Sequence, residues 1–342
     1  MGLNFIINNM RTYVIAEAGV NHNGNLNLAL KLVDKAKKIK ADCVKFQLFK
    51  HDNLATKYAP QAAYQKKNTK KKQTQLELLK KLELKYEYLK KIKKYCQNKK
   101  IDFLLSIFSA DELNIIRNLN LKTIKLPSGE INNVPLLKGI AKLRMNVILS
   151  TGMANIKEIA FALNILKKNG LRKDKISVLQ CTTDYPTKIE DVNLKSMITI
   201  NQKFKINIGL SDHTVGNESS IAAVALGAKI IEKHLTLDNK MNGPDHKASL
   251  NPQKFKELIS SIRNVETILG TGKKIPTKSE LKNKKIVRKS IVAKLSIKKG
   301  EKFSNQNIAC KRPEGGISPS MWEKIIGKKA KKNFSPDDLI KL

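Results

Sequence analysis

Short apolar runs alternate along the chain with longer segments in which apolar residues recur every three or four positions. Eight of the apolar runs have the length of single strands: Tyr13–Ala18, Cys43–Leu48, Phe103–Ser106, Thr123–Leu126, Val147–Ser150, Ile176–Gln180, Ile206–Leu210 and Lys229–His234. The segments between them predict helices at Leu28–Ile39, Gln75–Asn98, Ala110–Leu119, Leu136–Leu143, Ile156–Asn169 and Ser219–Leu226. This alternation predicts parallel strands joined by helical crossovers.

The number of strand–helix repeats favours one topology. Eight repeats that end near Gly270 match the roughly 250 residues of a (β/α)8 TIM barrel. The competing topology is a doubly wound open sheet, which needs no eighth strand and whose first turn often carries a GxGxxG phosphate-binding motif. That motif is absent after the first strand. The sequence therefore predicts an α/β fold built on a TIM barrel.

The pattern changes after Gly270. Thr271–Lys285 is polar and rich in lysine, which indicates a linker. Two short strands at Ser290–Leu295 and Ile308–Arg312 and a short helix at Pro319–Ile325 follow. About 55 residues are near the lower limit for independent folding, so we expect this part to rely on a partner surface. The predicted organisation is a catalytic barrel over residues 1–272, a linker over 273–286 and a small domain over 287–342.

The composition indicates a folded, soluble and cytoplasmic protein. Of the 342 residues, 41% are hydrophobic, which excludes global disorder. No apolar run approaches the roughly 18 residues of a membrane span. The segment Met1–Asn9 lacks a basic region, and Asn4 interrupts its apolar stretch, so we do not expect it to be a signal peptide.

The charge balance is unusual and leaves a second class of function open. Lys and Arg number 66 against 29 Asp and Glu, a net charge of +37. Such a field attracts polyanions, so a non-catalytic barrel that binds anions or nucleic acid is one alternative. The 5% aromatic content and the dispersed lysines argue against nucleic acid as a partner. Cys43, Cys96, Cys181 and Cys310 form no CxxC pair, so we expect free thiols rather than a zinc ribbon or a disulfide framework.

Polar residues gather where the predicted strands end, which is the catalytic end of a barrel. Lys45 and Gln47 alternate within one strand and therefore share a face, as do Glu232 and His234. Lys125 lies in another apolar strand. Hydroxyl groups stand at or after further strand ends: Ser106, Ser128, Ser150 and Ser211. Two lysines with hydroxyl donors suit a phosphate or carboxylate ligand.

Two of the five histidines end adjacent predicted strands. His213 and His234 could share a divalent metal ion, with Glu232 or Asp212 as carboxylates beside them. Two protein ligands would leave positions open for substrate oxygens. The alternative is a pair of structural, hydrogen-bonded histidines. A turn after the eighth strand places Asp245 over the same mouth of the barrel.

Motifs spread over the whole chain resemble a known family. They are Glu17–Gly24, Lys45–Gln47, Pro127–Glu130, Ser150–Met153, Gly209–Thr214 and Gly243–His246. In this order they resemble the bacterial sialic acid (N-acetylneuraminate) synthases, and Lys311–Pro313 resembles the motif of their C-terminal antifreeze-like (SAF) domain. The chain is thus similar to the nonulosonate synthases from about Tyr13 to its end.

This resemblance implies a reaction and an assembly. Members of the family condense phosphoenolpyruvate with an N-acylated mannosamine-type sugar and release phosphate. They use a divalent metal, so we expect Mn²⁺ here, with Mg²⁺ or Co²⁺ as alternatives. They form homodimers in which the SAF domain caps the partner's barrel. We expect neither a membrane nor nucleic acid as a partner.

The resemblance also implies roles for single residues. His213 and His234 match the metal ligands, and Glu17 and His234 match catalytic positions. Phosphoenolpyruvate-binding positions correspond to Lys45, Lys125, Ser128, Ser150 and Ser211. The acceptor-sugar positions correspond to Gln47, Tyr185, Asp245 and Arg312. Ser106 and Thr183 are further substrate-binding candidates, although Ile107 stands where the family often has proline and Thr183 replaces an asparagine of some members.

Two kinds of acceptor sugar, with three possible products, fit this reaction. N-acetylmannosamine, which would give N-acetylneuraminate, is the sugar we favour from the sequence. A 2,4-diacetamido-6-deoxy hexose would instead give legionaminate or pseudaminate.

Overall fold

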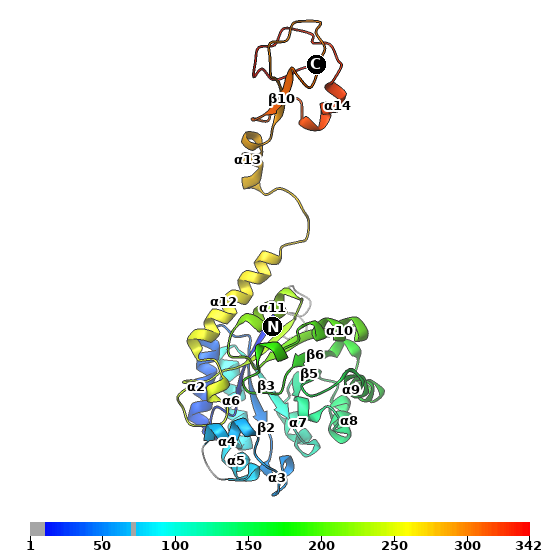
Figure 1. Cartoon of the computed structure of the whole chain (residues 1–342). Helices are drawn as coiled ribbons and strands as arrows, with labels where there is room; N and C mark the ends of the chain where they lie inside the picture. Colours follow the sequence, from blue (N-terminus) through cyan, green and yellow to red (C-terminus); the bar gives the residue numbers. More distant parts are fainter. Residues whose placement is uncertain (1–10, 70–72) are drawn as a thin grey trace. The chain divides into compact units, whose positions relative to one another are not determined.

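The computed structural model describes residues 11–69 and 73–342 of the chain (Figure 1). The prediction about Met1–Asn9 lies outside these residues. The chain divides after Gly270 into two compact units, and the second is Thr271–Leu342. Among the described residues, no helix combines the length and the apolar content that crossing a membrane requires.

The first unit is a closed barrel of eight parallel strands, as predicted. The strands are β1 (Tyr13–Gly19), β2 (Cys43–Leu48), β3 (Asp102–Ile107), β4 (Thr123–Leu126), β5 (Asn146–Ser150), β6 (Ile176–Cys181), β7 (Asn207–Asp212) and β8 (Ile230–His234). The helices of this unit are α2 (Leu26–Lys38), α3 (His51–Leu54), α4 (Ala63–Thr69), α5 (Gln75–Leu82), α6 (Tyr86–Lys99), α7 (Leu113–Asn118), α8 (Val134–Leu143), α9 (Ile156–Lys168), α10 (Lys195–Phe204), α11 (Glu218–Ala225) and α12 (Pro252–Leu269).

The side chains inside the barrel change from apolar to polar along the strands. An apolar layer fills the lower interior: Tyr13, Ile15, Cys43, Leu104, Ile148, Leu179 and Ile230. Two residues further along, the same face of each strand is mostly polar: Glu17, Lys45, Ser106, Ser150, Cys181 and Glu232. Successive inward positions are two residues apart in a strand, so this spacing sets a polar layer directly above an apolar floor. The outward faces pack against the helices in the larger core.

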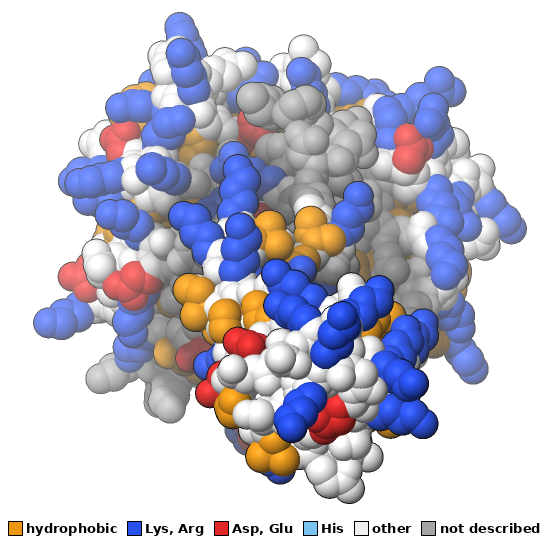
Figure 2. Space-filling model, turned by 90° about the horizontal axis from the view of Figure 1, so that it is seen from above, with side chains coloured by type: hydrophobic (Ala, Val, Ile, Leu, Met, Phe, Trp, Pro, Cys, Tyr) orange, Lys and Arg blue, Asp and Glu red, His pale blue; other side chains and the backbone are white. Residues whose placement is uncertain are grey.

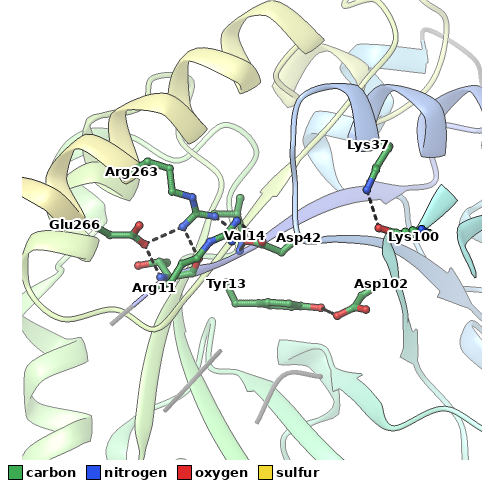
Figure 3. A network of polar contacts seen from close by, with 10 residues as sticks. Arg11, Tyr13, Val14, Lys37, Asp42, Lys100, Asp102, Arg263 and Glu266 are labelled. Carbon is green, nitrogen blue, oxygen red and sulfur yellow. Dashed lines mark hydrogen bonds and ion pairs between the residues drawn. The ribbon is translucent and has the colours of Figure 1, made fainter. Parts of the chain in front are cut away.

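A polar network lies at the opposite end of the barrel (Figure 3). Arg263 on α12 donates to Asp42 and Glu266 at 2.8 Å each. Asp42 also accepts from the backbone N–H of Val14 at 2.9 Å, which ties α12 to the start of β1. In (β/α)8 barrels this end serves stability rather than catalysis.

One predicted helix is divided in the structure. The sequence pattern predicted a single helix over Gln75–Asn98, but α5 ends at Leu82 and α6 begins at Tyr86. Glu83 is extended (φ −63°, ψ 131°), and its carboxylate accepts from the backbone N–H of His51 at 3.0 Å. Leu84 is buried. The break therefore exchanges helical hydrogen bonds for a tie to α3 and for the burial of Leu84.

The second unit has its own small core. Strands β9 (Ser290–Ala293) and β10 (Ile308–Lys311) form an antiparallel pair, and helix α14 (Trp322–Ile325) follows. Apolar side chains buried around them include Ile291, Phe303, Ile325 and Phe334. Part of the predicted linker is helical, because α13 (Lys278–Val287) begins within it. A capping box, in which Thr277 and Glu280 bond reciprocally, starts this helix.

Lysine and arginine side chains are scattered over the visible surface of both units (Figure 2). On that face they do not gather into one stripe. This agrees with the dispersed positions of the lysines in the sequence. The cysteines carry no disulfide, and Cys43, Cys96 and Cys181 are buried.

Candidate active site

The C-terminal ends of the strands surround one cavity of about 240 Å³. It is lined by most of the residues that the sequence analysis singled out: Glu17, Lys45, Gln47, Ser106, Lys125, Ser128, Ser150, Thr183, Tyr185, Ser211, His213 and His234. Asp245 is buried but is not part of this lining. Arg312 directly follows β10 in the second unit. The structure thus brings the predicted residues of the barrel, except Asp245, together around one cavity.

The carboxylate of Glu232 lies between the two lysines. Lys45 Nζ is 2.9 Å from Glu232 Oε2, and Lys125 Nζ is 2.7 Å from Glu232 Oε1. Ser211 Oγ donates to Glu232 Oε1 at 2.9 Å. Glu232 thus faces two ammonium groups and a hydroxyl, and it lines the same cavity as His213 and His234.

The second carboxylate of this cluster is less strongly held. Glu17 Oε2 is 3.5 Å from Lys45 Nζ. Burial raises the pKa of Glu17 to about 7, against the opposing effect of Lys45, and the nearby Glu232 adds to the rise. Glu17 is therefore able to gain and lose a proton near neutral pH, as general acid–base catalysis requires.

The remaining charges of the cluster stay fixed or titrate above neutral pH. Burial opposes ionisation of Glu232, but Lys125 and Lys45 hold the pKa of its carboxyl well below the usual range. Burial lowers the pKa of Lys125 to about 8. When Glu17 is protonated, two ammonium groups face one carboxylate, which leaves the cluster with net positive charge. The arrangement therefore favours an anionic ligand.

Hydroxyl groups around these charges have spare hydrogen-bonding capacity. Ser150 Oγ is buried without a hydrogen-bond partner in the described chain. Ser128 Oγ accepts from the backbone N–H of Gly152 at 2.8 Å. A Cβ at Gly152 would lie 2.0 Å from Thr183 Oγ1, so only glycine lets these loops approach. Ser150 in particular is free to donate to a bound anion.

The two histidines face each other at the mouth of β7 and β8. Their ring centroids are 5.5 Å apart. The Nδ1 atom of His213 is 2.7 Å from the carbonyl oxygen of Thr182. This contact uses Nδ1, so Nε2 is the ring nitrogen that remains for a ligand. The Nδ1 atom of His234 is buried and has no partner in the described chain. Burial, with the neighbouring His213, lowers the pKa of His234 well below its usual value, so its ring is neutral.

This donor set fits a divalent metal ion. Neutral imidazoles with unused nitrogen atoms are common ligands of divalent transition-metal ions. Within the described residues, no group of three or more His, Cys, Asp or Glu side chains is placed to bind a metal. A metal at the two histidines would thus keep open positions for other ligands.

Asp212, the other carboxylate expected beside the histidines, does not line the cavity. It pairs with Lys233 at 2.7 Å and accepts from Thr214 Oγ1 at 2.7 Å. Asp212 and Lys233 are neighbours in the β7–β8 register and are almost fully buried. This ion pair connects the two strands next to the histidines, because His213 directly follows Asp212 and His234 directly follows Lys233.

The excursion between β2 and β3 contributes residues that sequence reasoning missed. Leu54 on α3, Gln65 on α4, and Gln75 and Leu79 on α5 line the same cavity, together with Phe108 after β3. The Tyr64 ring lies 5.0 Å from the ring of Tyr185, which in turn packs 4.0 Å from His213. No motif marked this excursion, since its helices follow no repeat of the barrel.

Comparisons with known proteins place the chain in a family. The model described as "NeuB family" matches residues 32–274, and that described as "SAF domain" matches residues 288–342. The N,N'-diacetyllegionaminic acid synthase of Campylobacter jejuni is 50% identical over 97% of this chain and 99% of that protein. The N,N'-diacetyllegionaminic acid synthase of Legionella pneumophila is 42% identical over 95% and 92%.

A solved structure agrees with this assignment. The N-acetylneuraminic acid (sialic acid) synthetase of Leptospira borgpetersenii, in complex with citrate, superposes with a TM-score of 0.69 at 34% identity. The match covers 80% of this chain and 90% of that chain. The closed barrel, the charged cavity and the matched SAF domain all agree with these similarities. The chain therefore belongs to the NeuB family of phosphoenolpyruvate-dependent nonulosonate synthases.

Proposed function

We propose that the chain condenses phosphoenolpyruvate with a 2,4-diacetamido-6-deoxy hexose, forms N,N'-diacetyllegionaminate and releases phosphate. The observation that carries this proposal is the 50% identity over nearly the whole length of the Campylobacter jejuni N,N'-diacetyllegionaminic acid synthase. N-acetylmannosamine, the acceptor favoured by the motifs alone, has weaker support, since the sialic acid synthetase of Leptospira is 34% identical.

The charged cluster is suited to hold phosphoenolpyruvate. Lys45 and Lys125 would bind its phosphate and carboxylate, with donors from Ser128, Ser150 and Ser211. Ser106 and Thr183 line the same cavity and would complete this set. Because Glu232 already accepts from both lysines, it fixes the positions of their ammonium groups before the substrate arrives.

The reaction forms one carbon–carbon bond and breaks one carbon–oxygen bond. C3 of phosphoenolpyruvate attacks the aldehyde carbon of the sugar, whose oxygen becomes a hydroxyl group. A water oxygen adds at C2, and phosphate leaves with the bridging oxygen. Glu17 would position this water and accept its proton, which its pKa of about 7 permits near neutral pH.

His213 and His234 would hold a divalent metal, for which we propose Mn²⁺ with Mg²⁺ or Co²⁺ as alternatives. When bound, such an ion would polarise the carbonyl oxygen of the sugar as a Lewis acid. Gln47, Tyr185 and Asp245 would surround the sugar. Asp245 is buried, and burial raises the pKa of its carboxyl to about 6.

We also propose a homodimer in which the SAF unit of one chain caps the barrel of the other and brings Arg312 to the sugar. A guanidinium group suits this role, because its fixed set of donors can bind an acetamide or hydroxyl oxygen. We place the reaction in the cytoplasm, where phosphoenolpyruvate is made.

The test is phosphate release by the purified chain from phosphoenolpyruvate and each sugar. We expect release with the diacetamido hexose, little with N-acetylmannosamine, and none without a sugar. Chelation should abolish release, and added Mn²⁺ should restore it. Preference for N-acetylmannosamine would contradict the proposed acceptor, and release without any sugar would contradict the condensation.

A further inference from the structure

The cavity above the barrel has one wall of a different chemistry. The strand ends that line this cavity are charged, but another part of its lining is apolar. This part consists of Leu54, Leu79 and Phe108, with the amide of Gln75 among them. We call these four residues the excursion wall, because three of them come from the helices between β2 and β3. Phosphoenolpyruvate, which is small and highly charged, has little surface that could use it.

The excursion wall is firmly supported from behind. Leu79 belongs to a small apolar cluster with Val20, Phe49, Leu78 and Leu82, and Leu54 and Phe108 pack against that cluster. The rings of Phe49 and Phe108 meet edge to face with centroids 6.0 Å apart. A surface that is packed in this way is pre-shaped for its ligand.

The position of Gln75 is also fixed, but its side-chain amide is not used. Thr74 caps α5 immediately before Gln75, and the backbone N–H of Gln75 is 3.4 Å from the carbonyl oxygen of Ala59. Gln75 Oε1 is buried without a hydrogen-bond partner in the described residues. Two other amides line the cavity: Gln47 lies among the charged strand ends, and Gln65 Oε1 already accepts from the backbone N–H of Ala62 at 3.3 Å. A buried carbonyl oxygen without a hydrogen bond carries a free-energy cost that a ligand with an N–H group removes.

We infer that the excursion wall selects the acceptor by binding an acetamido group that the sugar carries in addition to the one of N-acetylmannosamine. Such a group presents a methyl beside an N–H and a carbonyl, which match the apolar side chains and the Gln75 amide. A hydroxyl at the same sugar position has no methyl to cover Leu54 and Leu79. This inference rests on the proposed function, since it explains how the diacetamido hexose is preferred.

The experiment compares two acceptors in the wild type and in Gln75→Met. Methionine fills a similar volume and removes the amide. We expect kcat/KM for the diacetamido hexose to fall about fivefold to twentyfold, the loss of one buried hydrogen bond. The kinetics of N-acetylmannosamine, as a substrate or as a competitive inhibitor, should stay within twofold. The Kd of phosphoenolpyruvate, measured by calorimetry, should not change.

Two further variants keep the result interpretable. Gln73→Met makes the same change just before α5, outside the cavity lining, and should leave both acceptors unaffected. Leu54→Asn, which tests the apolar part at a half-buried position, should lower the preference for the diacetamido hexose in the same direction. If the wild type prefers this sugar but Gln75→Met keeps the same ratio, the wall does not select the acceptor. If the wild type does not use this sugar, the proposed function fails first.

Discussion

Glu17 and Glu232 lie in the same layer of the barrel interior, yet their surroundings give them different roles. Glu232 touches two ammonium groups at 2.7 and 2.9 Å and remains a carboxylate. Glu17 has one ammonium group at 3.5 Å and titrates near pH 7. One carboxyl is thus a fixed counter-charge, and the other is able to move a proton.

Glu17→Gln should lower kcat by at least about 100-fold, the usual loss when a general base is removed. In the wild type, kcat/KM should rise with pH through about 7, because kcat/KM reports the free enzyme and the reactive form of Glu17 is the carboxylate. The residual rate of the variant should lack this rise. Glu190→Gln, at an exposed position, is the matched control. An unchanged pH profile in Glu17→Gln would contradict the role of this residue.

Glu232→Gln should destabilise the free enzyme, because two buried ammonium groups would lose their shared counter-charge. Breaking a buried pair costs about 3 kcal/mol of unfolding free energy. Saturating phosphoenolpyruvate should recover part of that loss by supplying negative charge to the same lysines. Urea denaturation with and without the ligand measures both values. Asp174→Asn, in an exposed pair with Arg172, should change neither, and an unaffected Glu232→Gln would refute the account.

At the scale of elements, hydrophobic periodicity predicted the barrel strands to within about two residues. Period two also placed Lys45 with Gln47 and Glu232 with His234 on inward faces, so most of the site followed from the sequence. The sequence did not predict that Glu232 pairs with Lys45 and Lys125, because it does not show which of several inward side chains contacts its carboxylate. The break between α5 and α6 was also missed, because Leu84 continues an apolar pattern that a helix would share. The capping box at Thr277 could have revealed α13 within the linker.

The buried pair of Asp212 and Lys233 connects β7 to β8 behind the two histidines. Lys233→Met should lower the unfolding free energy by about 3 to 5 kcal/mol, because Asp212 would be left buried and unpaired. The double change Asp212→Leu with Lys233→Met should recover much of this stability. A double-mutant cycle by denaturation measures the coupling, and additive losses would show that the pair does not act as a unit.

At the scale of the molecule, the sequence indicated two parts, but it could not show what lies opposite Arg312. That depends on an assembly of chains rather than on local pattern. The excursion wall was likewise invisible, since its residues become neighbours only when the barrel closes and the segment after β2 folds over it. Motif resemblance supplied the general reaction but favoured N-acetylmannosamine, whereas the relatives that match over nearly the full length are N,N'-diacetyllegionaminic acid synthases.

Arg312→Ala should weaken acceptor binding while leaving the barrel folded. If the arginine serves the partner's barrel, mixing Arg312→Ala chains with Glu17→Gln chains should regain activity. Random exchange would restore at most about a quarter of the sites, since half the dimers are mixed and each has one intact site. The measurement is phosphate release after subunit exchange has been verified. No recovery, or a fully active monomer, would mean that Arg312 does not act in trans.

The most direct test of the central claim is turnover of phosphoenolpyruvate and the diacetamido hexose in ¹⁸O-labelled water, with both products analysed by mass spectrometry after rapid quenching. Addition of water at C2, beside Glu17, predicts one new nine-carbon sugar acid per phosphate and phosphate without the label. Labelled phosphate, or pyruvate in place of the sugar acid, would show that water attacks phosphorus and would contradict the assignment of this site as a nonulosonate synthase centre.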